Sequence, residues 1–403
     1  MKINIVDAVT AISSKCDCFY LYSESSILER TAKLKTELPS VDFLYSIKCN
    51  HNPTVAETVF LQGFGADAAS LGEVRIAFEH GVSPGDIYYS APGKSYEDIE
   101  GAWGKANLIA DSLNEIELIE RIAASKGGEI NIGVRINPDT AFDGGRQIPS
   151  KFGIDEEQLI NFLPLRNCPH VHITGIHVHL RSQELNAGVI AKYYGNVLDL
   201  TSRVEETVGC ELEYINLGSG IGIPYAETDE EVELGILSET LRRMSAERKT
   251  RILIEVGRYA VCKSGYYATR VMDRKVSKGK TYIILKNALN GFLRPSIAKF
   301  VENYACNDIL PGCEPLYTGR DSFSFIAVNK SDAPNEEVCL VGNLCTAADV
   351  IAENVRMPHL EPGDMIMINN AGAYAAVLSP MQFSSQEKPE EYFLRTDGNI
   401  EKV

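Results

Sequence analysis

Short apolar runs alternate with longer stretches of helical periodicity from about residue 18 to residue 259. This alternation predicts parallel strands joined by crossover helices. Around eight such strands over about 240 residues fit a (β/α)8 barrel. A doubly wound open sheet is the alternative that the same pattern allows. The fold class expected is therefore α/β.

The expected elements of this region can be placed along the chain. Strands are predicted at residues 19–22 (FYLY), 42–48, 86–91, 106–112, 130–137, 172–180, 212–218 and 251–257. Helices are predicted at residues 26–38, 53–63, 72–81, 114–125 and 233–249. We place the barrel at residues 21–265.

The pattern changes after Gly265. Residues 266–276, 280–286, 322–328, 338–342 and 364–370 are strand-like, with turns between them. Only AADVIAENV, residues 347–355, has a helical pattern, and the acidic segment QEKPEEY, residues 386–392, is expected to be a solvated surface. A mainly β domain over residues 266–403, joined by residues 1–20, is predicted.

The charge balance excludes some classes of partner. Among 403 residues, 39 are basic and 55 are acidic, a formal net charge of −16. This argues against a nucleic-acid-binding or anionic-membrane-binding surface. The first residues lack the apolar core of a signal peptide, and no apolar run is long enough to span a membrane. A cytoplasmic protein without a metal site is expected.

Two charged residues stand where predicted barrel strands end. Lys48 ends DFLYSIK, and Glu255 ends RILI. Active sites of barrels lie at the carboxyl ends of the strands, where a lysine can form a Schiff base and a carboxylate can pair with a pyridinium nitrogen. Taken alone, Lys48 is more often a solvent-exposed lysine at a strand end, and Glu255 can equally be part of an ordinary surface ion pair.

Three further motifs are candidates. In LGSGIG, residues 217–222, the small residues allow backbone N–H groups to approach a phosphate, or the segment is a simple tight turn. His177 and His179 alternate and so share one face of their strand, but no third ligand suggests a metal. Cys345 precedes the predicted helix, where a thiolate would be stabilised, or it is a buried structural cysteine.

Together these motifs follow the order of one family. The chain resembles the pyridoxal 5'-phosphate (PLP) enzymes of the alanine-racemase barrel type, and among them the ornithine and diaminopimelate decarboxylases. The resemblance covers nearly the whole chain. It rests on YSIKCN (residues 45–50), DAASLGE (67–73), HVHLRSQ (177–183), LGSGIG (217–222), EVGR (255–258), GNLCTAAD (342–349) and AGAY (371–374).

The resemblance implies a role for each motif. Lys48 is the Schiff-base lysine, Glu255 pairs with the pyridine nitrogen, and His179 stacks on the ring. The remaining cofactor contacts implied by the match are Asp67, Ser182, Gly218, Ser219, Gly220, Gly257, Arg258 and Tyr374.

A further implication concerns a second subunit. Cys345 matches the cysteine that protonates the reacting carbon, and in the family this cysteine reaches into the partner's site. A head-to-tail homodimer, with the β domain contributing to shared active sites, is therefore implied.

The chain also departs from the family pattern. Thr346 stands where an acidic residue usually meets a distal amino group of the substrate, whereas Arg294 in NGFLRPS matches an arginine that binds a substrate carboxylate. Val256 replaces a proline, and Arg181 replaces a glycine. An anionic distal end, without a distal ammonium, is implied.

The expected function is therefore PLP-dependent decarboxylation of an amino-acid moiety. The departures resemble the branch that acts on anionic conjugates in siderophore or peptide-antibiotic biosynthesis, such as citryl-diaminopropionate or the microcin C precursor. The alternatives are a diaminopimelate- or ornithine-type decarboxylase, an amino-acid racemase, and a PLP-binding regulator without activity. The substrate is expected to be a small molecule or peptide conjugate.

Overall fold

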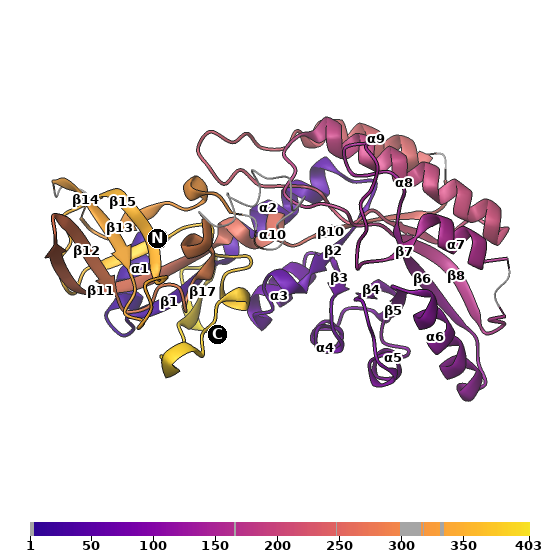
Figure 1. The fold of residues 1–403 in the computed structure, drawn as a ribbon, viewed down its shortest axis with the longest axis horizontal. Coiled ribbons are helices and arrows are strands. Elements are labelled where there is room, and N and C mark those ends of the chain that lie inside the picture. The colour runs from indigo at the N-terminus through magenta and orange to yellow at the C-terminus, as the bar shows by residue number, and fades with distance from the viewer. Residues whose placement is uncertain (1–3, 165–166, 247, 299–315, 317, 331–333) are drawn as a thin grey trace.

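A computed structural model describes residues 4–164, 167–246, 248–298, 316, 318–330 and 334–403. The chain forms a barrel and a β domain that lie end to end (Figure 1). Within the described residues, no helix is long and apolar enough to cross a membrane.

The barrel closes through parallel pairing. Its strand order is β5-β4-β3-β2-β10-β9-β8-β6, and a further pairing joins β5 to β6. In the described part of the chain the eight barrel strands are β2 (Asp42–Ser46), β3 (Gly65–Ala68), β4 (Ile87–Ser90), β5 (Asn107–Ala110), β6 (Ile130–Asn137), β8 (Val171–His177), β9 (Tyr214–Asn216) and β10 (Arg251–Val256), and the short β7 (Ile154–Asp155) pairs with β6. The barrel expectation is confirmed.

Helices surround these strands. They are α2 (Glu24–Glu37), α3 (Pro53–Phe60), α4 (Leu71–Glu79), α5 (Tyr96–Ala102), α6 (Leu113–Lys126), α7 (Glu156–Phe162), α8 (Ala187–Val208), α9 (Leu234–Ala246) and α10 (Arg258–Val261). Several begin with a capping side chain, as where the Ser70 hydroxyl accepts the backbone N–H of Glu73 and starts α4. Such caps fix each helix start just beyond a strand end, where the site is built.

Side chains from five of the barrel strands pack together in the interior. Leu44, Tyr88, Ile109, Tyr214 and Leu253 form one buried cluster that is separate from the main core. The Tyr214 side chain takes the space that a Cβ on Gly133 or Gly175 would occupy, because such an atom would lie 2.2 Å from its hydroxyl oxygen or from its ring, respectively. The barrel is therefore a packed core, and its open end is left for a site.

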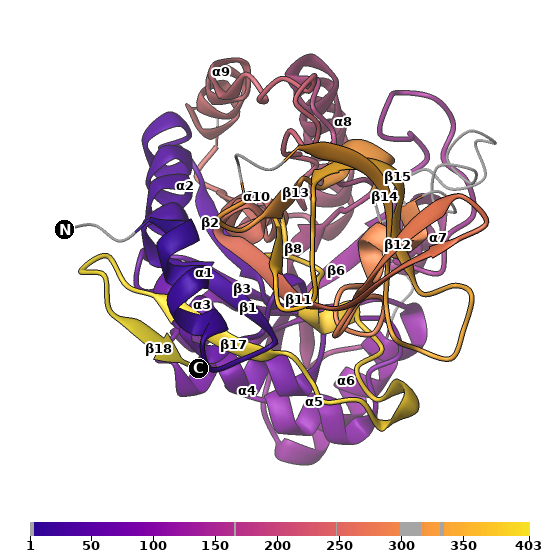
Figure 2. The same ribbon diagram turned by 90° about the vertical axis from the view of Figure 1, so that its left-hand side faces the viewer.

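The second domain is a curled sheet with one helix against it (Figure 2). In the described residues nine strands take part: β1 (Cys18–Ser23), β11 (Gly265–Ser277), β12 (Lys280–Leu285), β13 (Phe325–Ala327), β14 (Asn335–Val341), β15 (Val350–Pro358), β16 (Met365–Ile368), β17 (Glu390–Leu394) and β18 (Ile400–Lys402). Helix α1 (Ile5–Ser13) packs Ala8, Val9 and Ile12 against this sheet.

The expected barrel strand FYLY lies in the β domain instead. As β1 it pairs antiparallel with β11 and parallel with β17, so it lies across the predicted boundary between residues 20 and 21. The place expected for FYLY among the eight barrel strands is taken by β3, whose sequence is GADA and which was not predicted as a strand. Every residue of β1 is buried, and a strand covered on both faces has the continuous apolar sequence of a barrel strand.

The helix predicted for AADVIAENV is wrong. From Val350 onward the segment is β15, which pairs antiparallel with β14. Val350, Ile351 and Val355 are β-branched, and such side chains fit a pleated strand better than a helix. Strand pairing therefore prevails over the helical spacing.

The acidic segment is likewise not merely a solvated surface. Its last three residues belong to β17, and the Glu391 carboxylate accepts hydrogen bonds from the Tyr22 hydroxyl at 2.8 Å and the Asn52 amide at 3.1 Å.

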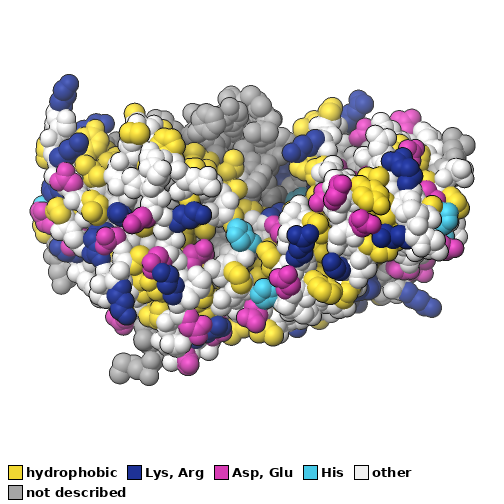
Figure 3. Space-filling view, turned by 90° about the horizontal axis from the view of Figure 1, so that it is seen from below, with side chains coloured by type: hydrophobic (Ala, Val, Ile, Leu, Met, Phe, Trp, Pro, Cys, Tyr) yellow, Lys and Arg dark blue, Asp and Glu magenta, His cyan; other side chains and the backbone are white. Residues whose placement is uncertain are grey.

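On the face shown in Figure 3, basic and acidic side chains are interspersed. That face presents no large field of a single sign.

A buried ion pair joins the loop between β4 and α5, which carries Lys94, to helix α6, which carries Glu115. The Lys94 ammonium, which is fully buried, donates to the Glu115 carboxylate, to the Ala91 carbonyl at 2.8 Å and to the Ile109 carbonyl at 2.6 Å. Burial lowers the pKa of Lys94 and raises that of Glu115, although each partner opposes the shift of the other. The pair depends on both partners being present.

We expect Lys94→Met to lower the free energy of unfolding by about 3–5 kcal/mol, because it leaves a buried carboxylate without its cation. Lys126→Met is the matched control, since Lys126 pairs with Glu100 at 3.4 Å on the surface. Its loss should cost about 0–1 kcal/mol. Urea unfolding of both variants measures the difference, and equal effects would contradict the account.

Candidate active site

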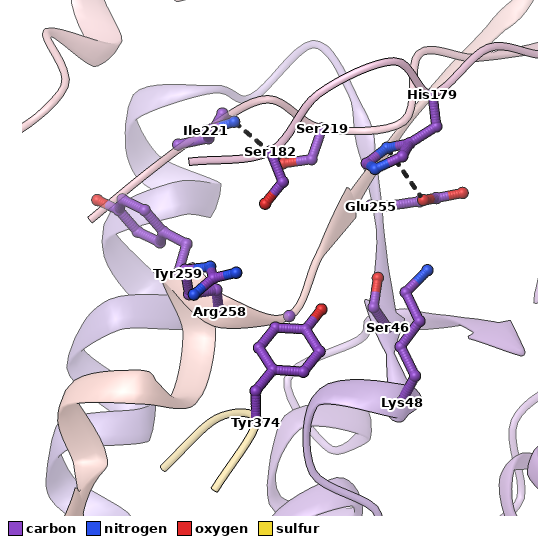
Figure 4. A pocket seen from close by; sticks show the side chains of 11 residues that line it. Ser46, Lys48, His179, Ser182, Ser219, Ile221, Glu255, Arg258, Tyr259 and Tyr374 are labelled. Carbon is purple, nitrogen blue, oxygen red and sulfur yellow. Dashed lines mark hydrogen bonds and ion pairs between the residues drawn. The ribbon is translucent and has the colours of Figure 1, made fainter. Parts of the chain in front are cut away.

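A pocket opens at the carboxyl ends of the barrel strands (Figure 4). Its walls come from barrel strand ends, from the loops that follow them and from one turn of the β domain. They comprise Ser46, Lys48, His179, Ser182, Ser219, Ile221, Glu255, Gly257, Arg258, Tyr259 and Tyr374. Most of the residues predicted for the cofactor meet here.

Lys48 lies on a short 3-10 turn, Ile47–Cys49, directly after β2. Its Nζ donates to Asp67 Oδ2 at 3.0 Å, and the Ser90 hydroxyl donates to Asp67 Oδ1 at 3.1 Å. Asp67 is fully buried, whereas the Lys48 side chain is 36% exposed. The carboxylate thus orients an amine that a ligand in the pocket can still reach.

Glu255 is the next-to-last residue of β10 and lies on the same side of the pocket as Lys48 (Figure 4). The Asn216 amide donates to Glu255 Oε1 at 3.0 Å, His177 Nε2 lies 3.0 Å from that oxygen, and His179 Nδ1 lies 3.8 Å from Oε2. Burial alone would raise the pKa of Glu255, but His177, Lys48 and His179 hold that pKa well below its usual range. The site therefore keeps a buried negative charge beside His179.

The glycine-rich loop after β9 forms one wall. Gly218 and Gly220 have φ values of +60° and +88°, which favour glycine. A Cβ on Gly218 would lie 2.5 Å from His179 Nδ1, and one on Gly220 would lie 2.9 Å from the Phe142 ring. The Ser219 hydroxyl accepts the N–H of Ile221 at 3.2 Å. The loop can thus come close to His179 and to Phe142 only because these two positions lack a side chain.

Arg258 and Tyr374 close the pocket from the side of the β domain. Arg258 opens α10 directly after β10, on the side of the pocket opposite Lys48 (Figure 4). Its guanidinium carbon lies 4.9 Å from the centre of the Tyr374 ring. Tyr374 has a φ of +53°, and its N–H donates to the Cys49 carbonyl at 2.7 Å. A strained backbone held by such a bond is typical of functional turns.

Six of the predicted site residues are not among those that line this pocket, and they are Asp67, Gly218, Gly220, Arg294, Cys345 and Thr346. Arg294 is fully buried, while Cys345 and Thr346 are exposed in the β domain. Cys345 does not precede a helix, so the argument from a helix N-terminus is wrong. It lies in a turn where the Asp349 carboxylate accepts the N–H of Leu344 at 2.9 Å.

Sequence reasoning missed some of the lining residues. Ser46, Ile221 and Tyr259 each stand within two residues of a predicted one. In the strand predicted for residues 42–48, alternation would have placed Ser46 on the same side as Lys48, although the structure ends β2 at Ser46. Asn216, which holds Glu255, carried no motif of its own.

The donor set fits PLP. Lys48 offers an amine for its aldehyde, and Glu255 offers a carboxylate for its ring nitrogen. The serine hydroxyls, the Arg258 guanidinium and the glycine-rich loop at residues 217–222 suit its phosphate. Among the described residues, no group of three or more His, Cys, Asp or Glu side chains is placed to hold a metal ion.

Comparison with known proteins agrees with this chemistry. Residues 24–262 match the pyridoxal binding domain of pyridoxal-dependent decarboxylases. The chain is 30% identical to the L-glutamyl-[BtrI acyl-carrier protein] decarboxylase of Niallia circulans, over 98% of this chain and 92% of that protein. It is 29% identical to the diaminopimelate decarboxylase of Helicobacter pylori strain J99, over 92% and 88%.

Solved structures share the fold. The crystal structure of Helicobacter pylori diaminopimelate decarboxylase complexed with L-lysine superposes with a TM-score of 0.84 at 26% identity. It covers 98% of this chain and 95% of that chain. The barrel with its β domain is thus an arrangement that these decarboxylases have in common.

Glu73, in the first turn of α4, makes the free energy of unfolding depend on pH. Its carboxylate accepts the N–H of Ala69 at 2.7 Å, and burial, with help from the Asp67 charge, raises its pKa from 4.5 to about 7. A carboxyl whose pKa is raised by folding stabilises the protein below pH 4.5. That contribution disappears as the pH rises through 7.

We expect the apo-protein to lose up to about 3 kcal/mol of unfolding free energy between pH 5 and pH 8 through this group. Glu73→Gln, which keeps the acceptor for Ala69, should remove that part of the slope. Glu97→Gln, at an exposed glutamate in the first turn of α5, is the control. Unfolding at a series of pH values measures the slope of the free energy of unfolding against pH. An unchanged slope in Glu73→Gln would contradict the role given to this carboxyl.

Proposed function

This chain belongs to the family of pyridoxal-dependent decarboxylases, and from that premise we propose that it decarboxylates an amino acid held in a larger conjugate. PLP-dependent decarboxylation of an amino acid is the activity common to the relatives. The conjugate that we put first is an aminoacyl group on a carrier protein. Anionic precursors of a siderophore or of a microcin C-type peptide antibiotic are the other candidates.

The observation that carries this choice is Thr346. It follows Cys345 directly, and its hydroxyl accepts the N–H of Ala348 at 3.3 Å within the same turn. By the family match this is where an acidic residue would meet a distal ammonium, and a neutral hydroxyl offers no such charge. A free diamino acid therefore lacks its counter-charge at this position.

The relatives support the same choice. The Niallia circulans protein is named for a substrate attached to an acyl-carrier protein, and its similarity extends over nearly the whole of both chains. The diaminopimelate decarboxylases are similar over most of their length as well. Decarboxylation of free diaminopimelate is therefore the alternative that an assay must address.

The residues of the pocket have distinct tasks in this proposal. When bound, PLP supplies an electron sink for the bond that breaks at the substrate's α-carbon. The ionised Glu255 favours a proton on the ring nitrogen, and Asn216 holds the carboxylate in place. Lys48, oriented by Asp67, is the point of covalent attachment. His179, backed by Glu255, bounds one face of the pocket.

Cys345 is proposed to act from a partner subunit. It is exposed, lies 3.7 Å from Ser384 Oγ and does not line the pocket of its own chain. Because the Cys345 thiol is exposed, a second copy of the chain can reach it. There it would deliver a proton to the carbon that has lost CO2, as the family match implies. Such a homodimer would share its two sites.

The choice of substrate is tested by release of CO2. We expect the protein to decarboxylate a glutamyl-carrier-protein thioester, or a citryl- or peptide-conjugated amino acid. Decarboxylation of free diaminopimelate, ornithine or lysine should be at least about a hundredfold slower. Mass spectrometry should show loss of 44 Da, and Lys48→Ala should abolish it. Efficient decarboxylation of a free diamino acid would refute the conjugate proposal. An unchanged mass with inverted stereochemistry would indicate a racemase.

Sharing of the site is tested by mixing subunits. Lys48→Ala and Cys345→Ala proteins should each be severely impaired alone. After unfolding and refolding together, part of the activity should return, because mixed dimers contain one site with both residues intact. Cys210→Ala, at another exposed cysteine, is the control for loss of a thiol. Absence of any recovery would argue that Lys48 and Cys345 act within one chain.

A further inference from the structure

Tyr225 lies behind the pocket, at the joint between the barrel and the β domain. It follows the glycine-rich loop in the run LGSGIGIPY and is only 8% exposed. Its ring packs 6.3 Å from that of Phe323, a residue of the β domain. No predicted motif includes this tyrosine, and it does not line the pocket.

Two arginines donate to the phenol oxygen of Tyr225. Arg258 Nη1 lies 2.6 Å from it and Arg294 Nη2 lies 2.8 Å from it. Both guanidinium groups also lie near the ring, with their carbons 5.7 Å and 5.1 Å from its centre. One neutral oxygen thus fixes two buried cations relative to one another.

The hydrogen bonds leave the phenol little freedom. A hydroxyl has two lone pairs and one proton, and the two guanidinium groups occupy both lone pairs. Cys262 Sγ lies 3.5 Å from the same oxygen, and the Cys262 thiol can donate to the Asn370 carbonyl at 3.3 Å. The phenol proton can therefore be directed to that sulfur, so that each hydrogen bond at the phenol oxygen has a defined direction.

Arg294 connects this network to the turn that carries Tyr374. Its Nη1 donates to the Ala373 carbonyl at 3.1 Å, one residue before Tyr374. The planar guanidinium uses one arm for the tyrosine and one for the backbone, a geometry that lysine cannot reproduce. Arg294 therefore stands in a second layer, behind the two residues that face the ligand.

We infer that Tyr225 is a positioning residue that holds Arg258 at the phosphate end of the pocket, with Arg294 supporting both Tyr225 and the Tyr374 turn. Arg258 lines the pocket and is fixed from behind by the phenol oxygen. Without that oxygen the guanidinium can swing away from the position where an anion would meet it. This role for Arg294 differs from the substrate contact expected from the sequence.

The test is a double-mutant cycle on the affinity of the apo-protein for PLP, measured by spectral titration. Tyr225→Phe should raise the dissociation constant roughly tenfold or more, because it removes an acceptor from a charged donor. In an Arg258→Met background the same change should have little further effect, since the tyrosine acts through that arginine. A purely structural role would weaken binding equally in both backgrounds.

Tyr214→Phe is the matched control. Tyr214 is also a buried phenol, but its hydroxyl, inside the barrel, has no hydrogen-bond partner among the described residues. Its loss should leave the affinity for PLP unchanged. An unchanged dissociation constant in Tyr225→Phe, or an additive cycle, would overturn the inference.

Arg294→Lys provides a second measurement if Tyr225→Phe does not fold. It should raise the dissociation constant of PLP, since lysine cannot hold both the phenol and the Ala373 carbonyl. An unchanged affinity for PLP would contradict the second-layer role. Neither measurement requires the substrate to be known, so a wrong substrate class would not affect either result.

Discussion

The closure of the barrel is the constraint on which the site depends. Parallel pairing of Ile109 with Gly133 and of Ala110 with Val134 joins β5 to β6 and completes the ring. Because all the strands run in one direction, their carboxyl ends converge. Lys48, His179 and Glu255 lie at or just after the ends of strands that are far apart in sequence, yet they share one pocket. Glycines at 133 and 175 leave room for Tyr214 inside the ring, so closure and core packing depend on each other.

The joint between the domains is the second requirement. Gly372 of the β domain lies so close to α10 that a Cβ on it would lie 1.8 Å from the Val261 carbonyl oxygen. This contact brings the turn with Tyr374 against the end of the barrel. The pocket is therefore finished by a residue that stands more than three hundred positions after Lys48. A side chain at Gly372 would separate the two halves of the site.

The sequence indicates the barrel and most of the pocket because both depend on local patterns. Apolar runs mark strands, and short motifs such as LGSGIG and EVGR mark their ends. The errors arise where tertiary pairing decides. FYLY is apolar enough for a barrel strand but is paired in the β domain, and the 347–355 segment has a helical spacing that pairing with β14 overrides. Tyr225 and the burial of Arg294 depend on contacts distant in sequence, which no single motif encodes.

The composite pocket also links the supply of cofactor to the persistence of the fold. A ligand that binds only the folded chain adds its binding free energy to the unfolding equilibrium, about 2.7 kcal/mol at a hundred times its dissociation constant. Here that ligand would bridge four barrel strand ends and the β-domain turn of Tyr374. Scarcity of the vitamin from which the cofactor is made would then reduce the amount of intact protein as well as its activity.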